Sequence, residues 1–448
     1  MPTVTAPTGT EHRSPTRVRR RAAWIVAIGA LVIMAAGIPV AVLNTRGHQA
    51  QTVARPDLQR VLVELTSGSA RIAPGATAYV AGPHGSWSGA AGVADVATGR
   101  PMPADARMRL ESVSKIWTAV LVLQLAEQGR LGLNDPVERW LPGLLPFGDR
   151  ITLRQLLTHT SGIFDNNDAV NHPARVLARV KDPGFHAELV RLAKRLQADP
   201  TIQFPPTVWI RLAATQPLYF PPGTSYHYSN VGFEVLGLVI ERVTGQPLEA
   251  VYRERIFQPL GLDQTAYDPQ GDITGPHARG YLVNRDGSLA DQTAVHWGIG
   301  AEGGIVSDAA DTARFLTALM QGRLLGPVAA AGMRTGDFWS AGGDTPSCGG
   351  SAYGHSGAGE GYKTNVWVSS DGRRVVVLLL NGRMADQATG NQRAAQALDQ
   401  LYCSAEPELA AAADPERPQA QRQTSNERHA RAGVSDRRGA GRVWRAAR

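Results

Sequence analysis

The stretch RLESVSKIWTAVLVLQLAEQG (109–129) guides the interpretation of the whole chain. Residues 116–126 are apolar apart from one threonine and one glutamine, which predicts a helix that is buried on all sides. The segment begins, however, with Ser112 and, three residues later, Lys115. Lysine is seldom buried without a partner, so the sequence predicts a polar group that holds Lys115 inside the protein.

The composition is that of a globular protein whose basic residues gather at the two ends. Of the 448 residues, 43% are apolar and 19% are charged. The formal net charge is +7, with +5 carried by residues 1–50 and +6 by residues 418–448, which leaves −4 for residues 51–417. This distribution argues against a nucleic-acid-binding domain.

Lysine is rare in this chain, with four residues against 42 arginines. An arginine stays protonated in proteins, whereas a desolvated lysine can lose its proton. A rare lysine at the start of a buried helix therefore suggests that its proton is used.

The N-terminal segments of the chain predict export. Residues 1–21 are basic and expected to be cytoplasmic, and residues 22–43 are apolar over about 33 Å, enough to cross a bilayer. This segment is either a membrane anchor or a cleaved signal peptide. Both alternatives, followed by a linker (44–54), place residues 55–405 outside the cytoplasm.

Residues 406–448 form a basic tail that we expect to be disordered, with contact to anionic lipid or wall polymers as the alternative.

The segments between these ends predict strands, then helices, then strands again. A strong hairpin signal, Asp371-Gly372, separates the last two strands, and residues 386–402 predict a helix. Strands from both ends forming one sheet around a helical insertion would give an α+β or mixed α/β fold. The predicted strands are ATAYVA (76–81), GSWSGAAGVAD (85–95), TNVWVSS (364–370) and RRVVVLLLNG (373–382).

The two cysteines, Cys348 and Cys403, allow one disulfide. An exported domain can keep such a bond, so we expect a bridge between the late loop and the C-terminal helix. The alternative is a pair of free thiols.

The first motif with chemical potential is Ser112-Val113-Ser114-Lys115. One helical turn brings positions i and i+3 to the same face, so Lys115 can reach the Ser112 hydroxyl. Burial lowers the pKa of a lysine and makes it a credible base, and a backbone N–H at the helix start can stabilise an oxyanion. The alternative is that Ser112 caps the helix and Lys115 extends to solvent.

Two further motifs lie in glycine-rich surroundings. In Tyr228-Ser229-Asn230 the tyrosine can shuttle a proton and the asparagine can hold a substrate carbonyl. In His355-Ser356-Gly357 the glycine lets a substrate approach a strand edge closely. Each of these motifs alone would more simply be an ordinary loop or turn.

Together, in this order, the three motifs resemble the serine β-lactamase and penicillin-binding family, whose class A members carry Ser-x-x-Lys, Ser-Asp-Asn and Lys-Thr-Gly. Tyr-Ser-Asn and His-Ser-Gly in second and third place are similar to the class C β-lactamase branch and its D-alanyl-D-alanine carboxypeptidases. The resemblance covers roughly residues 58–403, with an extra helical stretch at 172–216. It implies an α/β, β-lactamase/transpeptidase-like fold, with an antiparallel sheet of N- and C-terminal strands and a large helical insertion.

The resemblance implies a role for each motif residue. Ser112 is the nucleophile that forms an acyl-enzyme, and Lys115 and Tyr228 share the proton transfer, with the acylation base left open. Asn230 holds the substrate amide. We expect Tyr228 and Asn230 to be the polar groups that hold Lys115 in place. His159 is expected to be structural.

The third motif is implied to bind substrate from the strand side. His355 and Ser356 line the site, and the Ser356 hydroxyl meets a substrate carboxylate. Gly357 allows close approach, and the backbone N–H of Ala358 completes the oxyanion hole with that of the nucleophile. Trp297 is either an aromatic wall of the pocket or a core tryptophan. The sequence shows no His/Cys cluster at metal-ligand spacing, so no metal is expected.

The chain departs from the carboxypeptidases in the residues that would grip a terminal carboxylate. The run GDFWSAGGDTPSCGG (336–350) lacks an arginine, and Ala358 stands where a threonine is found in them. A bidentate arginine is a strong carboxylate handle, so its absence weakens the peptidase assignment. Lys363 could compensate, but a solvated strand residue is expected.

These observations predict an exported serine hydrolase, without metal or organic cofactor, that acts on a small peptide, ester or β-lactam through a Ser112 acyl-enzyme. The leading prediction is a D-alanyl-D-alanine carboxypeptidase-like peptidase. The alternatives are an esterase or D-amino-acid amidase, a class C-type β-lactamase, and a catalytically silent module that binds cell-wall peptides. The oligomeric state is left open.

Overall fold

The computed structural model describes residues 55–68, 71–83, 85–269, 273–295, 297–334 and 345–405. Outside them lie four predicted segments at the ends of the chain: 1–21, 22–43, 44–54 and 406–448. Within the described ranges, no helix is both long and apolar enough to cross a membrane.

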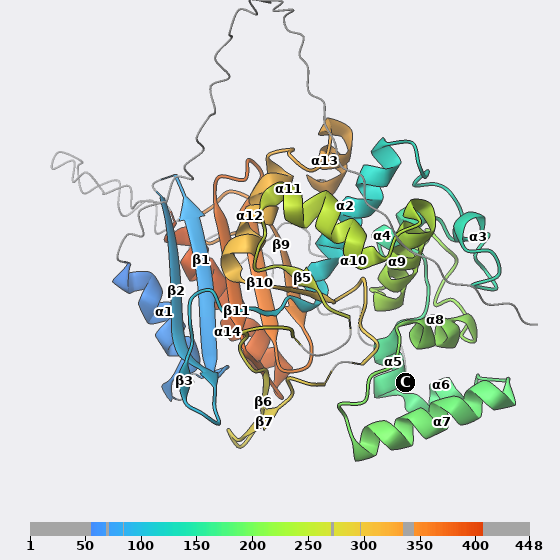
Figure 1. Ribbon diagram of the computed structural model, residues 1–448, viewed down its shortest axis with the longest axis horizontal. Helices are drawn as coiled ribbons and strands as arrows, with labels where there is room; N and C mark the ends of the chain where they lie inside the picture. The colour runs from blue at the N-terminus through green and yellow to red at the C-terminus, as the bar shows by residue number, and fades with distance from the viewer. Residues whose placement is uncertain are drawn as a thin grey trace, which may run out of the picture. The chain divides into compact units, whose positions relative to one another are not determined.

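The centre of the domain is a six-stranded sheet in which every neighbouring pair is antiparallel. Its strand order, β3-β2-β1-β11-β10-β9, joins the first strands of the domain to the last ones (Figure 1). At the junction, Ala76 lies opposite Leu380 and Ala81 opposite Val375. The predicted strands and the antiparallel sheet are therefore confirmed. The strands are β1 (Gly75–Gly82), β2 (Gly85–Asp95), β3 (Arg100–Pro101), β9 (Ala352–Ala358), β10 (Lys363–Ser369) and β11 (Val375–Leu380).

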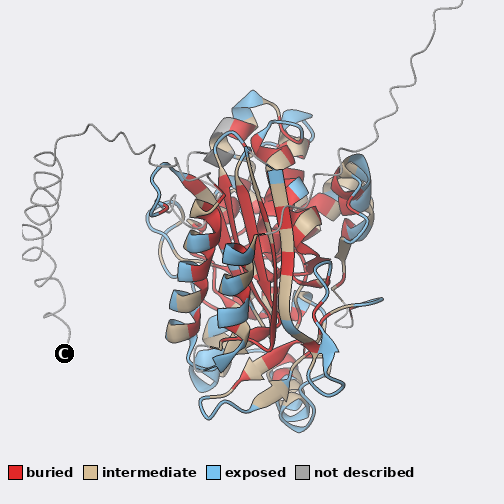
Figure 2. Cartoon of the chain, turned by 90° about the vertical axis from the view of Figure 1, so that its left-hand side faces the viewer, coloured by how far each residue is buried: buried red, intermediate tan, exposed pale blue. Residues whose placement is uncertain are grey.

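Strand β11, with the sequence VVVLLL, is apolar throughout because both of its faces are buried. Val376 and Leu378 belong to the core beneath α1 and α14, whereas Val377 and Leu379 belong to the larger core on the other face. In Figure 2 the central strands of the sheet are buried, and the helices in front of them expose their outer faces. The helices that cover the sheet are α1 (Pro56–Thr66) and α14 (Gln387–Cys403) on one face and α12 (Ala309–Met320) on the other.

The region between β3 and β9 is the predicted helical insertion. Its helix α2 has 11 buried residues, as the opening stretch of sequence predicts. Trp117 of α2 stacks on Phe315 of α12 with ring centroids 3.6 Å apart, which joins the insertion to the sheet layer. The helices are η2 (Glu111–Val113), α2 (Ser114–Glu127), α3 (Val137–Trp140), α4 (Leu153–Leu157), α5 (Asn166–Asn171), α6 (Pro173–Leu177), α7 (Pro183–Ala198), α8 (Thr207–Ala214), α9 (Asn230–Thr244), α10 (Leu248–Tyr252), η3 (Arg253–Phe257), α11 (Gln258–Leu260) and α13 (Pro327–Arg334).

Two small sheets complete the fold, in the orders β12-β6-β7 and β4-β8-β5. The second brings β8, and the turn that precedes it, next to the nucleophile segment, because β4 ends at Arg109 and pairs with β8. The extra helical stretch at 172–216 forms α6, α7 and α8 (Figure 1). The short strands are β4 (Met108–Arg109), β5 (Ala266–Tyr267), β6 (Tyr281–Val283), β7 (Leu289–Asp291), β8 (Ile305–Ser307) and β12 (Gly382–Met384).

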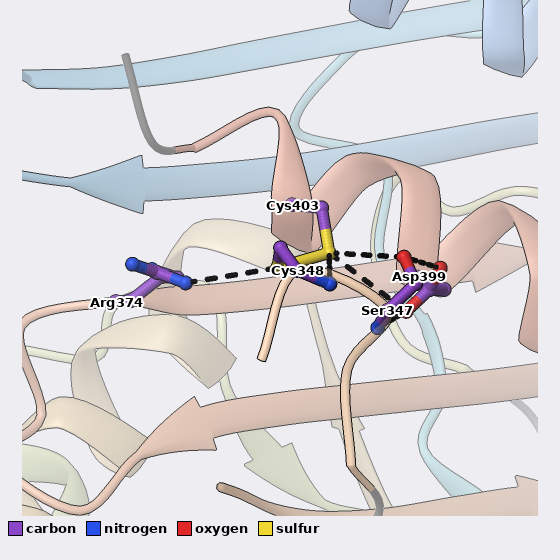
Figure 3. Close-up of a disulfide and its surroundings, with 5 residues drawn as sticks. All are labelled: Ser347, Cys348, Arg374, Asp399 and Cys403. Atoms are coloured by element: carbon purple, nitrogen blue, oxygen red, sulfur yellow. Dashed lines mark hydrogen bonds between the residues drawn. A yellow bond between two sulfur atoms is a disulfide. The ribbon is translucent and has the colours of Figure 1, made fainter. Parts of the chain in front are cut away.

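Cys348 and Cys403 form a disulfide, as predicted (Figure 3). It joins the segment before β9 to the last residue of α14. The same junction is held by Asp399, whose carboxylate accepts hydrogen bonds from the backbone N–H of Ser347 at 2.8 Å and from its hydroxyl at 2.5 Å. The bond therefore fixes the approach to β9, the strand that carries the third motif.

We expect the double variant Cys348→Ser/Cys403→Ser to be less stable than the wild type by about 2–4 kcal/mol. The bond closes a loop with a sequence separation of 55 residues, so its loss gives entropy back to the unfolded chain. Urea unfolding of both proteins, with and without reductant, measures the difference. Reductant should destabilise the wild type alone, and equal sensitivity in both proteins would contradict the interpretation.

Candidate active site

Ser112 lies in the short helix η2, directly before α2, and is partly exposed. The N-cap of α2 is Val113, and no side chain caps this helix. Lys115 lies in the first turn of α2 with only 2% of its surface exposed. Ser112 therefore does not cap α2 and Lys115 does not reach solvent, which removes the simpler interpretation of this motif.

The Lys115 ammonium is held by Ser112 and by a residue that the sequence analysis missed, Glu302. Its Nζ donates to Ser112 Oγ at 3.2 Å, to the Glu302 carbonyl oxygen at 3.0 Å and to Glu302 Oε2 at 2.5 Å. It also lies 5.0 Å from the centre of the Tyr228 ring. Tyr228 is thus a neighbour of Lys115 as predicted, but the strongest partner is Glu302.

The pKa of Lys115 moves in the direction opposite to the sequence-based prediction. Burial is the largest single effect and lowers it, but the charges and hydrogen bonds of Glu302 and Tyr228 together outweigh burial and raise the pKa above that of an ordinary lysine. The prediction of a lysine with a lowered pKa is therefore wrong. The physical reason is that the ammonium is paired with a buried carboxylate.

Tyr228 lies directly before α9 and is held by its neighbours. Its ring stacks on His159 with centroids 4.4 Å apart, and the following N–H, of Ser229, donates to His159 Nδ1 at 3.1 Å. Burial raises the pKa of Tyr228, and Lys115 and Ser112 offset part of this rise. His159 stays neutral, because burial and the charge of Lys115 lower its pKa to about 3. This geometry supports a structural role for His159.

Asn230 is the first residue of α9 and does not hold Lys115. Its backbone N–H donates to Asp165 Oδ2 at 2.6 Å, and its Nδ2 donates to Asn166 Oδ1 at 3.1 Å. Its side-chain oxygen is buried without a hydrogen-bond partner. The prediction of Asn230 as a partner of Lys115 is therefore wrong, and its contact with a substrate amide stays a prediction.

The third motif lies on the edge strand β9, with alternate residues facing opposite ways. His355 and Gly357 are buried, whereas Ser356 and Ala358 are exposed. A Cβ added at Gly357 would lie 3.0 Å from Glu111 Cβ and 3.1 Å from the Ser112 amide nitrogen. The glycine is thus needed for close approach of β9 to the nucleophile. Burial and the charge of Lys115 lower the pKa of His355 to about 4.

Trp297 is half-buried and bound to the extra helical stretch. Its indole N–H donates to the Pro200 carbonyl at 2.7 Å, and its own carbonyl accepts from the Trp209 indole at 3.0 Å. It lies five residues before Glu302 in the chain. These bonds connect the stretch at 172–216 to the turn that holds the nucleophile's lysine.

Lys363 does not extend into solvent, contrary to expectation. It is 6% exposed, and its ammonium donates to Asn391 Oδ1 of α14 at 2.8 Å. Burial, with a smaller effect from Arg383, lowers the pKa of Lys363 to about 8. The pairing with α14 occupies Lys363 on the far side of β10, so it does not replace the missing arginine.

Two further buried carboxyls, Glu111 and Glu234, interact with Glu302. Glu234 of α9 accepts backbone N–H groups of Gly300 at 2.8 Å and Ala301 at 3.1 Å, and burial, with Glu302, raises its pKa to about 8. Glu111, next to Ser112, has φ +52°, which is unusual outside glycine, and its Oε1 has no hydrogen-bond partner.

Within the described residues, no group of three or more His, Cys, Asp or Glu side chains is placed to hold a metal ion.

The fold and this arrangement define the class of β-lactamase/transpeptidase-like serine hydrolases. The sequence model of the family described as Beta-lactamase matches residues 51–399. The chain therefore belongs to the beta-lactamase family.

Named relatives differ in what they act on. Esterase EstB of Burkholderia gladioli is 38% identical over 196 residues, covering 42% of this chain and 45% of EstB, about half its length. Penicillin-binding protein 4 of Amycolatopsis lactamdurans is 28% identical over 66% of this chain and 77% of its own. The structure of a D-stereospecific amidohydrolase from Streptomyces sp. is 30% identical, with a TM-score of 0.63 over 77% of this chain and 98% of that one.

Deprotonation of the buried Glu111 carboxyl should make the free energy of unfolding of the protein fall as the pH rises. Burial, partly offset by Arg109, raises its pKa from 4.5 to about 8, so the folded state binds the extra proton. The stability that the protonated carboxyl contributes is fully present below about pH 4.5. It is lost as the pH rises through the folded-state pKa of about 8. We therefore expect the free energy of unfolding of Glu111→Gln, relative to wild type, to increase by up to about 1.4 kcal/mol per pH unit in this window.

Urea unfolding at about pH 5, 6, 7 and 8 measures this gain. The matched control is Glu64→Gln on the exposed face of α1, which removes a carboxyl that is not buried, so the pH-dependent gain should be specific to Glu111→Gln. A pH-independent difference for Glu111→Gln would show that its carboxyl is charged in the folded protein.

Proposed function

We propose that this protein is an amidohydrolase that cleaves D-amino-acid amides or short D-peptides through a Ser112 acyl-enzyme. The observation that carries the proposal is the 3.2 Å contact between Ser112 Oγ and Lys115 Nζ, beside Tyr228, at a partly exposed serine. A hydroxyl hydrogen-bonded to a proton-transfer system is the arrangement that nucleophilic catalysis requires.

In the proposed reaction, Ser112 Oγ attacks the substrate carbonyl carbon and its proton passes to the Lys115–Tyr228 system. The backbone N–H groups of Ser112 and Ala358 stabilise the oxyanion; losing one such donor typically costs about 10²–10³ in rate. The tetrahedral intermediate expels the amine, which takes a proton from the same system, and water then releases the acid from Ser112.

The cations near the third motif favour an amidase over a carboxypeptidase. Lys363 is bound to Asn391 of α14, and Arg383 donates to the Gly359 carbonyl at 3.2 Å and lies 3.8 Å from Glu360. Both cations are thus already engaged, and Ala358 carries no hydroxyl. The similarity to the Streptomyces amidohydrolase, which covers 98% of that chain, supports the same choice. The carboxypeptidase-like activity remains the competing prediction.

Substrate comparison tests this proposal. We expect kcat/KM for D-phenylalanine amide to exceed that for an N-acylated D-Ala-D-Ala peptide by at least about tenfold, because about 1.4 kcal/mol of carboxylate binding is missing. An activated ester and benzylpenicillin complete the set. Ser112→Ala should abolish turnover of every substrate.

Each outcome identifies one activity. Preferential release of the terminal D-alanine would support the carboxypeptidase, and ester cleavage alone would support an esterase. Rapid loss of benzylpenicillin would support a β-lactamase. Identical behaviour of wild type and Ser112→Ala on all four substrates would contradict the enzyme assignment and support a binding module.

We also propose that the domain works outside the cytoplasm, attached through residues 22–43. The disulfide and the basic residues before the apolar segment support this location. We expect protease added to intact cells to digest the domain, and the full-length mass to be recovered from membranes with detergent. A shorter, soluble product would indicate a cleaved signal, and protection from protease would contradict export.

A further inference from the structure

Glu302 lies 187 residues after Lys115 in the chain, yet the two side chains form a buried ion pair. Their exposed fractions are 3% for Lys115 and 10% for Glu302. Lys115 Nζ lies between two oxygens, Ser112 Oγ at 3.2 Å and Glu302 Oε2 at 2.5 Å. The three side chains therefore form a continuous path from the nucleophile to a carboxylate.

We propose that Glu302 is the positioning residue that receives the Ser112 proton through Lys115. This inference rests on the proposed function and deepens it. As Ser112 Oγ bonds to the substrate carbonyl carbon, its proton moves to Lys115 Nζ and Lys115 gives one of its own protons to Glu302 Oε2. Lys115 remains an ammonium, Glu302 becomes a neutral acid, and the negative charge moves to the substrate oxygen. The proton returns along the same path to the leaving amine.

The two residues to which the sequence assigns the proton transfer both hold their own protons. Pairing with Glu302 raises the pKa of Lys115 despite burial, and burial raises that of Tyr228. A protonated lysine cannot accept a proton unless it releases one at the same time. The carboxylate in contact with Lys115 is the group that allows this exchange.

The turn that carries Glu302 is fixed from two helices. From α9, the carboxyl oxygens of Glu234 accept the N–H groups of Gly300 and Ala301. From α2, the Thr118 hydroxyl donates to the Ala301 carbonyl at 2.5 Å. Glu302 is therefore held against Lys115 by the same helices that carry Lys115 and Asn230.

The titratable groups around the pair define a pH range for the test. The two histidines, with pKa values of about 3 and 4, are neutral above about pH 5, and Glu111 and Glu234, with pKa values of about 8, are protonated below about pH 7. Between about pH 5 and pH 7 these four groups do not change charge, so the pH dependence of the reaction rate can be compared directly among variants. The groups that face the pair are Glu111, His159, Asp165, Tyr228, Glu234, Tyr267 and His355.

The test is the rate at which a fluorophosphonate modifies Ser112 in the full chain, read by intact mass between about pH 5.5 and 7. We expect Glu302→Gln to react about 10²–10³ times more slowly than wild type near pH 7. Its rate should rise up to about tenfold per pH unit, because Lys115, without its carboxylate, must lose a proton before it can act as a base. The wild-type rate should vary much less.

Glu234→Gln is the matched control. It removes a carboxyl that holds the same turn but does not contact Lys115, so any loss of rate should leave the shape of the pH profile as in wild type. Glu302→Asp, which keeps the charge but shortens the reach, should be slow with a wild-type-like profile. It also serves as the second variant if Glu302→Gln does not fold, as judged by thermal unfolding.

Two results would overturn the inference. One is a Glu302→Gln rate within about threefold of wild type; the other is a slow rate with an unchanged pH profile, which would mean a structural role. In the Lys115→Ala background, Glu302→Gln should cause no further loss. Failure of wild-type Ser112 to react at all would refute the proposed function instead, so the two failures are distinguishable.

Discussion

The buried pair of Lys115 and Glu302 is the constraint on which the candidate site depends. A buried ammonium is costly unless a partner compensates for its lost hydration. Here the partner comes from the turn before β8, so the start of α2 must lie against that turn. Ser112, one helical turn before Lys115, is thereby placed at the surface beside Tyr228. The pair therefore connects the position of the nucleophile with the packing of the helical region.

The sheet supplies the other wall of the site. Strand β11 is buried on both faces and holds β1 on one side and β10 on the other. This arrangement sets β9 at the edge, where Gly357 lets its backbone approach Ser112. A side chain at this glycine would press on Glu111 and the Ser112 amide. Strand β9 can thus lie close to the nucleophile only because Gly357 has no side chain.

Short-range patterns in the sequence were sufficient to predict the strands, the hairpin at Asp371-Gly372 and the buried helix α2. They also predicted that Lys115 must have a partner. They could not identify that partner, because Glu302 lies in the segment AEGG, 187 residues away, and its role depends on tertiary packing. The wrong direction for the pKa of Lys115 has the same cause. Lys363 was misjudged because its contact, Asn391, lies on a helix packed on the sheet.

The described domain begins and ends at neighbouring points, since the Arg55 guanidinium donates to the Ser404 carbonyl at 2.7 Å. Helices α1 and α14, which carry these ends, pack side by side on one face of the sheet. The fold therefore does not require that the chain begin and end at these two points. A circular permutation that joins these ends with a short linker and opens an exposed loop of the helical region would preserve every strand pair.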